Sequence, residues 1–342
     1  MPLDDVHHQP FAVGTLKGAL SSRHVPHAWL FFGPDGVGKE LAAVSLAQAL
    51  TCPVQPFAGC GKCPSCQRVA RGSHPDVSWV MPEDELVRRG LRGRSDFSAA
   101  PSRDIRIEQV RRLQERLSLR ALEATHKVAL IVAAHAMNPP AQNALLKTLE
   151  EPPKDTVLIL VSSAPDKLLP TIRSRCSKAG FGPLPAAFIA ERVVALKKGV
   201  DKAAAEQVAA LAGGSLSRAL ELDADLLLER RALIARFEAL ERGDARGWLL
   251  LAETMGEDRR TAEAALGVLQ AWFRDVAVAQ VGGASQLDVQ LAELAQRASA
   301  KVTPAGLMRR LMLLDQARNS IVQRNGAARL QLERMFVEMF ST

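Results

Sequence analysis

The residues from Gly33 to Lys39 have the types and spacing of a loop that binds phosphate, but the next residue is not a usual magnesium ligand. The segment GPDGVGKE fits G-x-x-x-x-G-K, a pattern in which backbone N–H groups surround phosphate oxygens and the lysine reaches the terminal ones. A Ser or Thr hydroxyl normally follows that lysine and binds Mg²⁺, whereas this chain has Glu40. With Gly33, Gly36, Gly38 and Lys39 in place, the sequence predicts a phosphate loop without its metal ligand.

A second departure from ATPase chemistry follows about ninety residues later. The apolar run Lys127–His135 predicts a buried strand, with Val132 and Ala133 near its end. An ATPase needs acidic residues there, which hold the metal and orient the attacking water. Nucleotide hydrolysis is therefore not expected, while ATP binding stays open. Ser162 and Ser163, at the tip of the next strand, either sense a γ-phosphate or simply end the strand.

Four of the five cysteines have the spacing of a metal site. Cys52, Cys60, Cys63 and Cys66 fall within fifteen residues as C-x7-C-x2-C-x2-C. Four thiolates at such a spacing suit tetrahedral Zn²⁺, and a site closed by four sulfurs has a structural role. Disulfides are the alternative, but a reducing cytosol disfavours them. Cys176 lies far away in sequence and is expected to be a small buried residue.

A basic segment lies between the cysteines and the strand predicted in Lys127–His135. Arg88, Arg89, Arg92 and Arg94 crowd into residues 83–102 of a chain whose net charge is +7. Such a segment could contact a phosphate backbone. No aromatic residues interleave with the arginines, and the chain has no Tyr for base stacking. A solvated, partly disordered insertion is therefore the favoured interpretation.

The composition favours a water-soluble protein of two or three domains. The chain has 342 residues, of which 47% are hydrophobic, enough to build substantial cores. No apolar stretch approaches the ~20 residues needed to cross a bilayer, and the first residues lack the pattern of a secretory signal. A cytoplasmic location without membrane contact is expected.

Short apolar runs alternate with helical patterns over the first 180 residues, which predicts an α/β domain with a parallel sheet. The run Ala28–Phe32 is a strand that leads into the phosphate loop, and the Ala-rich stretch Leu41–Leu50 continues as a helix. Asn138 precedes two prolines and is a predicted helix cap. From residue 223 onward, Leu, Ala, Arg and Glu recur at helical periods, which predicts an all-α region.

Several motifs together resemble the clamp-loader branch of the AAA+ proteins, and within it the delta-prime subunits of bacterial DNA polymerase III. They are GPDGVGK at 33–39, the four-cysteine module, NALLKTLEEPP at 143–153, SRC at 174–176 and GGSLSRAL at 213–220. The resemblance implies a RecA-like AAA+ domain with a zinc module at 1–180, a small helical lid at 181–222 and a helical collar at 223–342. The last part carries no comparable motif.

The resemblance also implies a function. The chain would be a stator, a subunit that does not hydrolyse ATP but places the arginine finger Arg175 against the ATP site of a neighbouring subunit. Alternatively, Arg175 forms an ion pair within its own domain, and Arg173 acts as the arginine finger. Arg218 matches a second sensor arginine. If the chain holds a nucleotide or phosphate, Arg218 would clamp the second domain to the first; alternatively it is structural and forms an ion pair along its helix.

The implied partners are the motor subunits gamma and tau, the delta subunit and, through the complex, the sliding clamp and primer-template DNA. Two other functions stay open. The chain could be a gamma/tau-like ATPase motor, but Glu40, Val132 and Ala133 are not the residues that such a motor needs to bind magnesium and orient water. It could also be a zinc-bearing nucleic-acid adaptor, which strong salt-dependent DNA binding would support. No acidic metal-binding constellation suggests polymerase activity of the chain itself.

Overall fold

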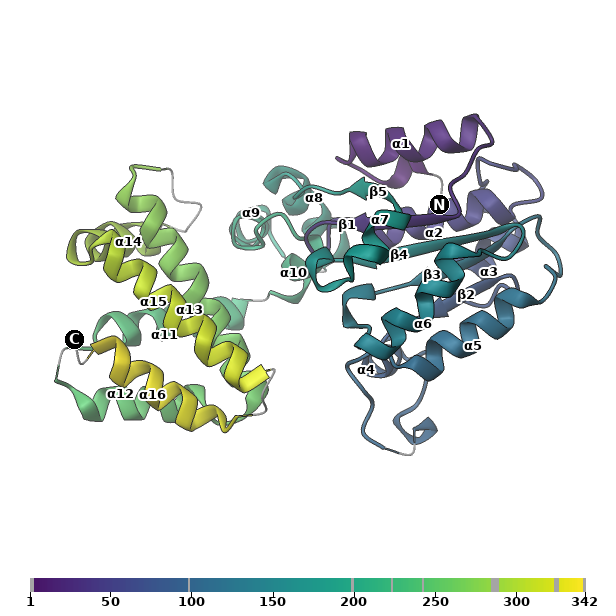
Figure 1. Ribbon diagram of the computed structural model, residues 1–342. Helices are drawn as coiled ribbons and strands as arrows, with labels where there is room; N and C mark the ends of the chain where they lie inside the picture. Colours follow the sequence, from purple (N-terminus) through teal and green to yellow (C-terminus); the bar gives the residue numbers. More distant parts are fainter. Residues whose placement is uncertain are drawn as a thin grey trace. The chain divides into compact units, whose positions relative to one another are not determined.

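The structure is a computed structural model that describes residues 3–97, 99–197, 200–222, 224–241, 243–283, 289–322 and 326–340. Internal contacts divide the chain into two units. The first comprises residues 1–185 with 214–217, and the second comprises residues 186–213 with 218–342. Figure 1 shows a sheet with helices in the first unit and helices alone in the second.

The first unit is built on the predicted parallel sheet. Its five strands lie in the order β2-β3-β4-β1-β5, and all pairs are parallel. Every residue of β3 and β4 is buried, as expected for strands covered by helices on both faces. The strands are β1 (Ala28–Phe32), β2 (Val77–Val80), β3 (Lys127–Ile131), β4 (Thr156–Ser162) and β5 (Ser177–Gly180).

The helices of this unit also follow the sequence pattern. In α5 the residues at helical spacing, Val110, Leu113 and Leu117, are buried. The helix α6 begins as predicted, because the side chain of Asn138 accepts a hydrogen bond from the N–H of Ala141 at 3.0 Å. The helices are α1 (Pro10–Ser21), α2 (Lys39–Thr51), α3 (Pro64–Ala70), α4 (Glu83–Arg88), α5 (Ile107–Ser118), α6 (Pro139–Glu150) and α7 (Pro170–Arg175).

The second unit contains only helices among its described residues. Aromatic side chains form the centre of its main core, where Phe237, Phe273 and Phe340 surround the guanidinium of Arg310 at 5.8–6.0 Å from each ring centroid. The helices are α8 (Ala186–Leu196), α9 (Lys202–Leu211), α10 (Leu216–Glu221), α11 (Ala224–Glu238), α12 (Ala245–Met255), α13 (Arg259–Gln280), α14 (Val289–Lys301), α15 (Pro304–Val322) and α16 (Ala328–Phe340). The first two residues of α10, Leu216 and Ser217, belong to the first unit.

The predicted α/β-then-α class is confirmed. The predicted division into parts 1–180, 181–222 and 223–342 stays a prediction, and its boundary residue Asp223 lies outside the described residues. Across the described part of the chain, no helix is both long and apolar enough to cross a membrane.

Candidate functional site

The phosphate loop lies between β1 and α2, which is the predicted strand-loop-helix context. Gly33, Gly36 and Gly38 all have positive φ angles, at 141°, 71° and 99°. A Cβ at Gly33 would lie 2.1 Å from the carbonyl oxygen of Phe181, and one at Gly36 would lie 2.2 Å from Oγ of Ser217. Glycine is therefore required at both positions by backbone conformation and by space.

Lys39 is turned back into the loop that it ends. Its side chain is only 5% exposed, and Nζ donates to the carbonyl oxygen of Gly33 at 2.7 Å and to that of Pro34. The carboxylate of Asp35 lies 3.6 Å from Nζ. Burial lowers the pKa of Lys39, and Asp35 opposes that shift. The ammonium group therefore has oxygen partners within its own loop.

Neighbouring segments of the first unit bind the same loop. The buried side chain of Gln9 donates to the carbonyls of Val37 at 3.3 Å and Gly182 at 2.8 Å, and it accepts the N–H of Gly182 at 2.9 Å. The N–H of Leu216 donates to the carbonyl of Gly36 at 3.0 Å. These contacts fix the loop between the start of the chain and the segment Gly214–Ser217, which belongs to the same unit.

Glu40 is paired with an arginine of the Arg-rich segment, residues 83–102. Its Oε1 lies 2.5 Å from Nη1 of Arg89, and its Oε2 lies 2.9 Å from Nη2. Arg89 follows α4, and its Nε also donates to Glu85 at 2.6 Å. The expectation of a solvated, partly disordered segment is wrong for this arginine, because a two-point ion pair holds it on the first turn of α2.

The positions where an ATPase carries acidic residues are apolar, as the sequence indicates. Val132 is buried just beyond β3, and Ala133 follows with a left-handed φ of 53°. Ser162 is also buried; its Oγ accepts the N–H of Ala164 at 3.2 Å and lies 3.4 Å from Nδ1 of His135. Burial lowers the pKa of His135. His135 was not among the predicted site residues, since no motif distinguishes it.

Arg175 lies at the end of α7 and is bonded within its own unit. Nη2 donates to Oε1 of Glu150 at 2.8 Å, and Nη1 donates to the carbonyl of Thr171 at 3.1 Å. Its neighbour Arg173 is paired with Asp166 at 2.9 Å. In the chain alone, Arg175 thus forms an ion pair within its own domain, which is one of the two alternatives that the sequence leaves open. Arg218 lies in α10, and the structure places it in the second unit.

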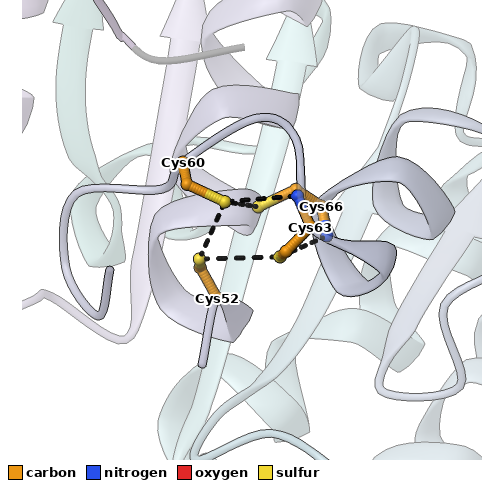
Figure 2. A group of neighbouring side chains, drawn as sticks. All are labelled: Cys52, Cys60, Cys63 and Cys66. Carbon is orange, nitrogen blue, oxygen red and sulfur yellow. Dashed lines mark hydrogen bonds between the residues drawn. The ribbon is translucent and has the colours of Figure 1, made fainter. Parts of the chain in front are cut away.

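The four-cysteine cluster, Cys52, Cys60, Cys63 and Cys66, lies between the end of α2 and the start of α3 (Figure 2). All four sulfurs lie within 4.8 Å of one another. The separations are 3.6 Å for Cys52–Cys60, 3.8 Å for Cys52–Cys63 and 4.0 Å for Cys60–Cys66. A tetrahedral zinc with Zn–S bonds of about 2.3 Å has sulfurs ~3.8 Å apart, so these residues fit a metal ion.

Backbone N–H groups also prepare the cluster for thiolates. The N–H of Gln55 points at the sulfur of Cys52 at 3.2 Å, and that of Cys63 points at the sulfur of Cys60 at 3.3 Å. Backbone N–H groups lower the pKa of Cys60 to about 6, whereas burial raises the pKa of Cys66 to about 12. A cation beside the buried sulfur would favour its thiolate form.

Cys176 lies outside the cluster, as predicted. It packs in the apolar core beneath α6 and α7, where burial raises the pKa of its thiol to about 12. A neutral thiol in such surroundings is inert.

Comparisons with known proteins identify the family. The protein-family model described as "DNA polymerase III, delta subunit" matches residues 8–185, which is more than half of the chain. The "DNA polymerase III subunit delta'" of Pseudomonas aeruginosa is 40% identical over 61% of this chain and 59% of its own length, less than two thirds of that protein. The Bacillus subtilis protein of the same name is 30% identical over 82% of this chain and 81% of its own.

A second kind of relative shares part of the sequence. The "DNA polymerase III subunit tau" of Bacillus subtilis is 32% identical over 64% of this chain and 36% of its own length. The match to the delta' protein of that organism covers more of both chains. The chain therefore belongs to the DNA polymerase III delta' family.

Proposed function

We propose that the chain is a non-hydrolysing stator of the bacterial DNA polymerase III clamp loader, which supplies Arg175 to the ATP site of a neighbouring subunit. The observation that carries this proposal is the chemistry around its own phosphate loop. Glu40 is bonded to Arg89, and the side chains of Val132 and Ala133 have no oxygen to offer to a metal or water. Magnesium and the attacking water both need such oxygens, so this subunit contributes to hydrolysis elsewhere.

Arg175 is the residue that would act on the neighbour's nucleotide. A guanidinium stays charged and offers two parallel donors to phosphate oxygens. Its side chain is 37% exposed, and its partner Glu150 is 49% exposed. An exposed ion pair of this kind is worth about 0–1 kcal/mol, so a triphosphate of higher charge can displace Glu150. A fully engaged arginine finger raises hydrolysis by about 10³–10⁵-fold.

The four-cysteine cluster would hold a structural zinc. Cys52, Cys60, Cys63 and Cys66 supply all four ligands, which leaves no position for a substrate. The zinc would join the end of α2 to the start of α3, where Ser65 also donates to the carbonyl of Thr51 at 3.0 Å. Its chemistry here is to fix a loop beside the helix that carries the phosphate loop.

The assembly would contain the partners of the clamp loader. These are the motor subunits gamma and tau, the delta subunit, the sliding clamp and primer-template DNA. Within the chain, residues 181–222 would serve as the lid, with Arg218 as the sensor arginine, and residues 223–342 as the collar. A cytoplasmic location follows from this role.

A gamma/tau-like ATPase motor is the alternative that similarity to tau favours. The two functions differ in what the isolated chain does with Mg·ATP. Glu40, Val132 and Ala133 predict no turnover by the chain alone. Turnover should appear only when motor subunits, delta, sliding clamp and primed DNA are added.

The test is steady-state ATP hydrolysis with each combination of these components. The mixture that lacks this chain is the control, because motor subunits can have activity of their own. The stator function is supported if the chain alone hydrolyses no ATP and if ATP hydrolysis by the mixture increases only when this chain is present. Robust magnesium-dependent turnover by the purified chain would instead make it a motor.

A further inference from the structure

The contact between Glu40 and Arg89 joins the phosphate loop to a helix that lies far from it in sequence. Both carboxylate oxygens of Glu40 are engaged, at 2.5 and 2.9 Å from the two terminal nitrogens of Arg89. The two side chains are 34% and 31% exposed, so water reaches them only in part. Bidentate charge-assisted pairs of this geometry are among the stronger contacts that a protein surface forms.

The helix α4 and the contacts around it position Arg89. Nε of Arg89 donates to Glu85 at 2.6 Å, and Glu85 is only 19% exposed. The base of the segment is closed by two hydrogen bonds: the N–H of Asp84 donates to the carbonyl of Ser102 at 3.1 Å, and the N–H of Ser102 donates to Glu83 at 2.9 Å. Arg89 is thus positioned by α4 and not by a freely moving loop.

The charges around the loop do not fit a magnesium nucleotide. In the usual pattern a neutral hydroxyl follows the lysine and binds a divalent cation that offsets the triphosphate. Here a carboxylate stands at that position, and the cation beside it is a guanidinium. To bind Mg·ATP, Glu40 would have to release Arg89 or remain next to phosphate oxygens of the same charge. Lys39 would also have to exchange its bonds to Gly33 and Pro34.

We propose that Arg89 is a built-in counter-cation of the phosphate loop, which pairs with Glu40 where a nucleotide-binding loop holds Mg²⁺ and closes this loop to magnesium nucleotide. The Arg-rich segment thereby has a defined role: α4 keeps the phosphate loop in a fixed, nucleotide-free form. The proposal concerns the chain by itself and does not depend on any action of Arg175 in a complex.

The test measures the affinity of the full chain for ATP by isothermal titration calorimetry, with Mg²⁺ and with EDTA. The wild type should show no binding at millimolar ATP in either buffer. Glu40→Thr removes the repelling carboxylate and releases Arg89, so its affinity should rise at least about tenfold and persist in EDTA. In the Glu40→Thr/Arg89→Ala double variant, binding should require Mg²⁺, because the substitute cation is gone.

Arg88 offers a matched control, because it is paired with Glu85 and does not contact Glu40. Glu40→Thr/Arg88→Ala should bind ATP in EDTA as Glu40→Thr does. If Glu40→Thr does not fold by circular dichroism, Glu40→Gln replaces it with the same expectation. Measurable Mg·ATP binding by the wild type at millimolar nucleotide, no gain in either folded Glu40 variant, or equal binding in EDTA with and without Arg89 would each overturn the proposal.

Discussion

At the residue scale, the charged groups of the phosphate loop are already satisfied by the chain. Lys39 donates to two carbonyls of its own loop, and Glu40 is bonded to Arg89. The buried hydrogen bonds of Lys39 contribute about 1.5–3 kcal/mol each, whereas the Glu40–Arg89 pair, about one third exposed, is screened by water and contributes less. A ligand that entered the loop would have to replace these contacts as well as form its own.

The sequence predicts the missing metal ligand but not the partner of Glu40. The first is a local property, since one position after Lys39 decides it. The second depends on tertiary packing, because Glu40 and Arg89 are 49 positions apart and no motif connects them. The cysteine cluster lies between these extremes: all four ligands fall within fifteen residues, so their spacing alone predicts the convergence seen in Figure 2.

The cysteine cluster yields a prediction about metal content. Cys63→Ser should lose stoichiometric zinc and lower the free energy of unfolding by at least ~3 kcal/mol, because zinc binding contributes directly to folding of the loop between α2 and α3. Zinc content by atomic emission, and hydrogen exchange over residues 52–66, measure this. Cys176→Ala is the matched control, since Cys176 is buried elsewhere and should leave the metal in place. Full zinc occupancy in Cys63→Ser would contradict the assignment.

At the element scale, the alternating pattern of apolar runs predicts a parallel sheet, but not the order β2-β3-β4-β1-β5. Periodicity reports which residues are buried and is silent about which strand edges meet. Local start signals, by contrast, predict where α6 begins, because Asn138 caps the helix and two prolines follow it. The sequence does not predict α4, because a short segment with many charges has the pattern of a solvated loop. Only the structure shows that Glu40 binds Arg89 at the end of this helix.

A buried carboxylate fixes the connection between α5 and β3. Asp76 is 7% exposed and accepts the backbone N–H groups of Leu122 at 2.7 Å and of Glu123 and Ala124 at 2.8 Å each. Burial opposes ionisation, but the three N–H donors outweigh it and lower the pKa of Asp76. Because the pKa is depressed in the folded state, the ionised group stabilises the fold above the unfolded pKa of about 3.9.

The stabilisation by Asp76 should therefore disappear as the pH falls below about 4, through the depressed pKa of the folded state. Asp76→Asn should lower the free energy of unfolding at pH 7 by about 1–3 kcal/mol, and this deficit should shrink at lower pH. Urea unfolding from pH 7 to pH 3 measures both effects. Asp5→Asn, an exposed carboxylate at the start of the chain, is the control. A deficit that does not change with pH would show that the charge is not the cause.

At the scale of the whole molecule, the chain combines a phosphate loop whose Lys39 and Glu40 are bonded within the chain with an arginine exposed at the end of α7. The first feature explains why hydrolysis is not expected in this subunit. The second is the group that, under the proposed function, would act on a neighbour's nucleotide. Under the proposed division of labour, this chain takes part in ATP hydrolysis only within an assembly, and the isolated chain should show no turnover.

The most direct measurement is ATP hydrolysis by the reconstituted ring of clamp-loader subunits, with clamp and primed DNA, carrying Arg175→Ala in this chain. The ring should lose the share of turnover that comes from the neighbouring site, where hydrolysis should fall by ~10³-fold or more. Arg173→Ala is the matched control. Arg173 lies two residues before Arg175 and is paired with Asp166, so its substitution should leave turnover unchanged. Unchanged turnover in a fully assembled Arg175→Ala ring would contradict the stator account.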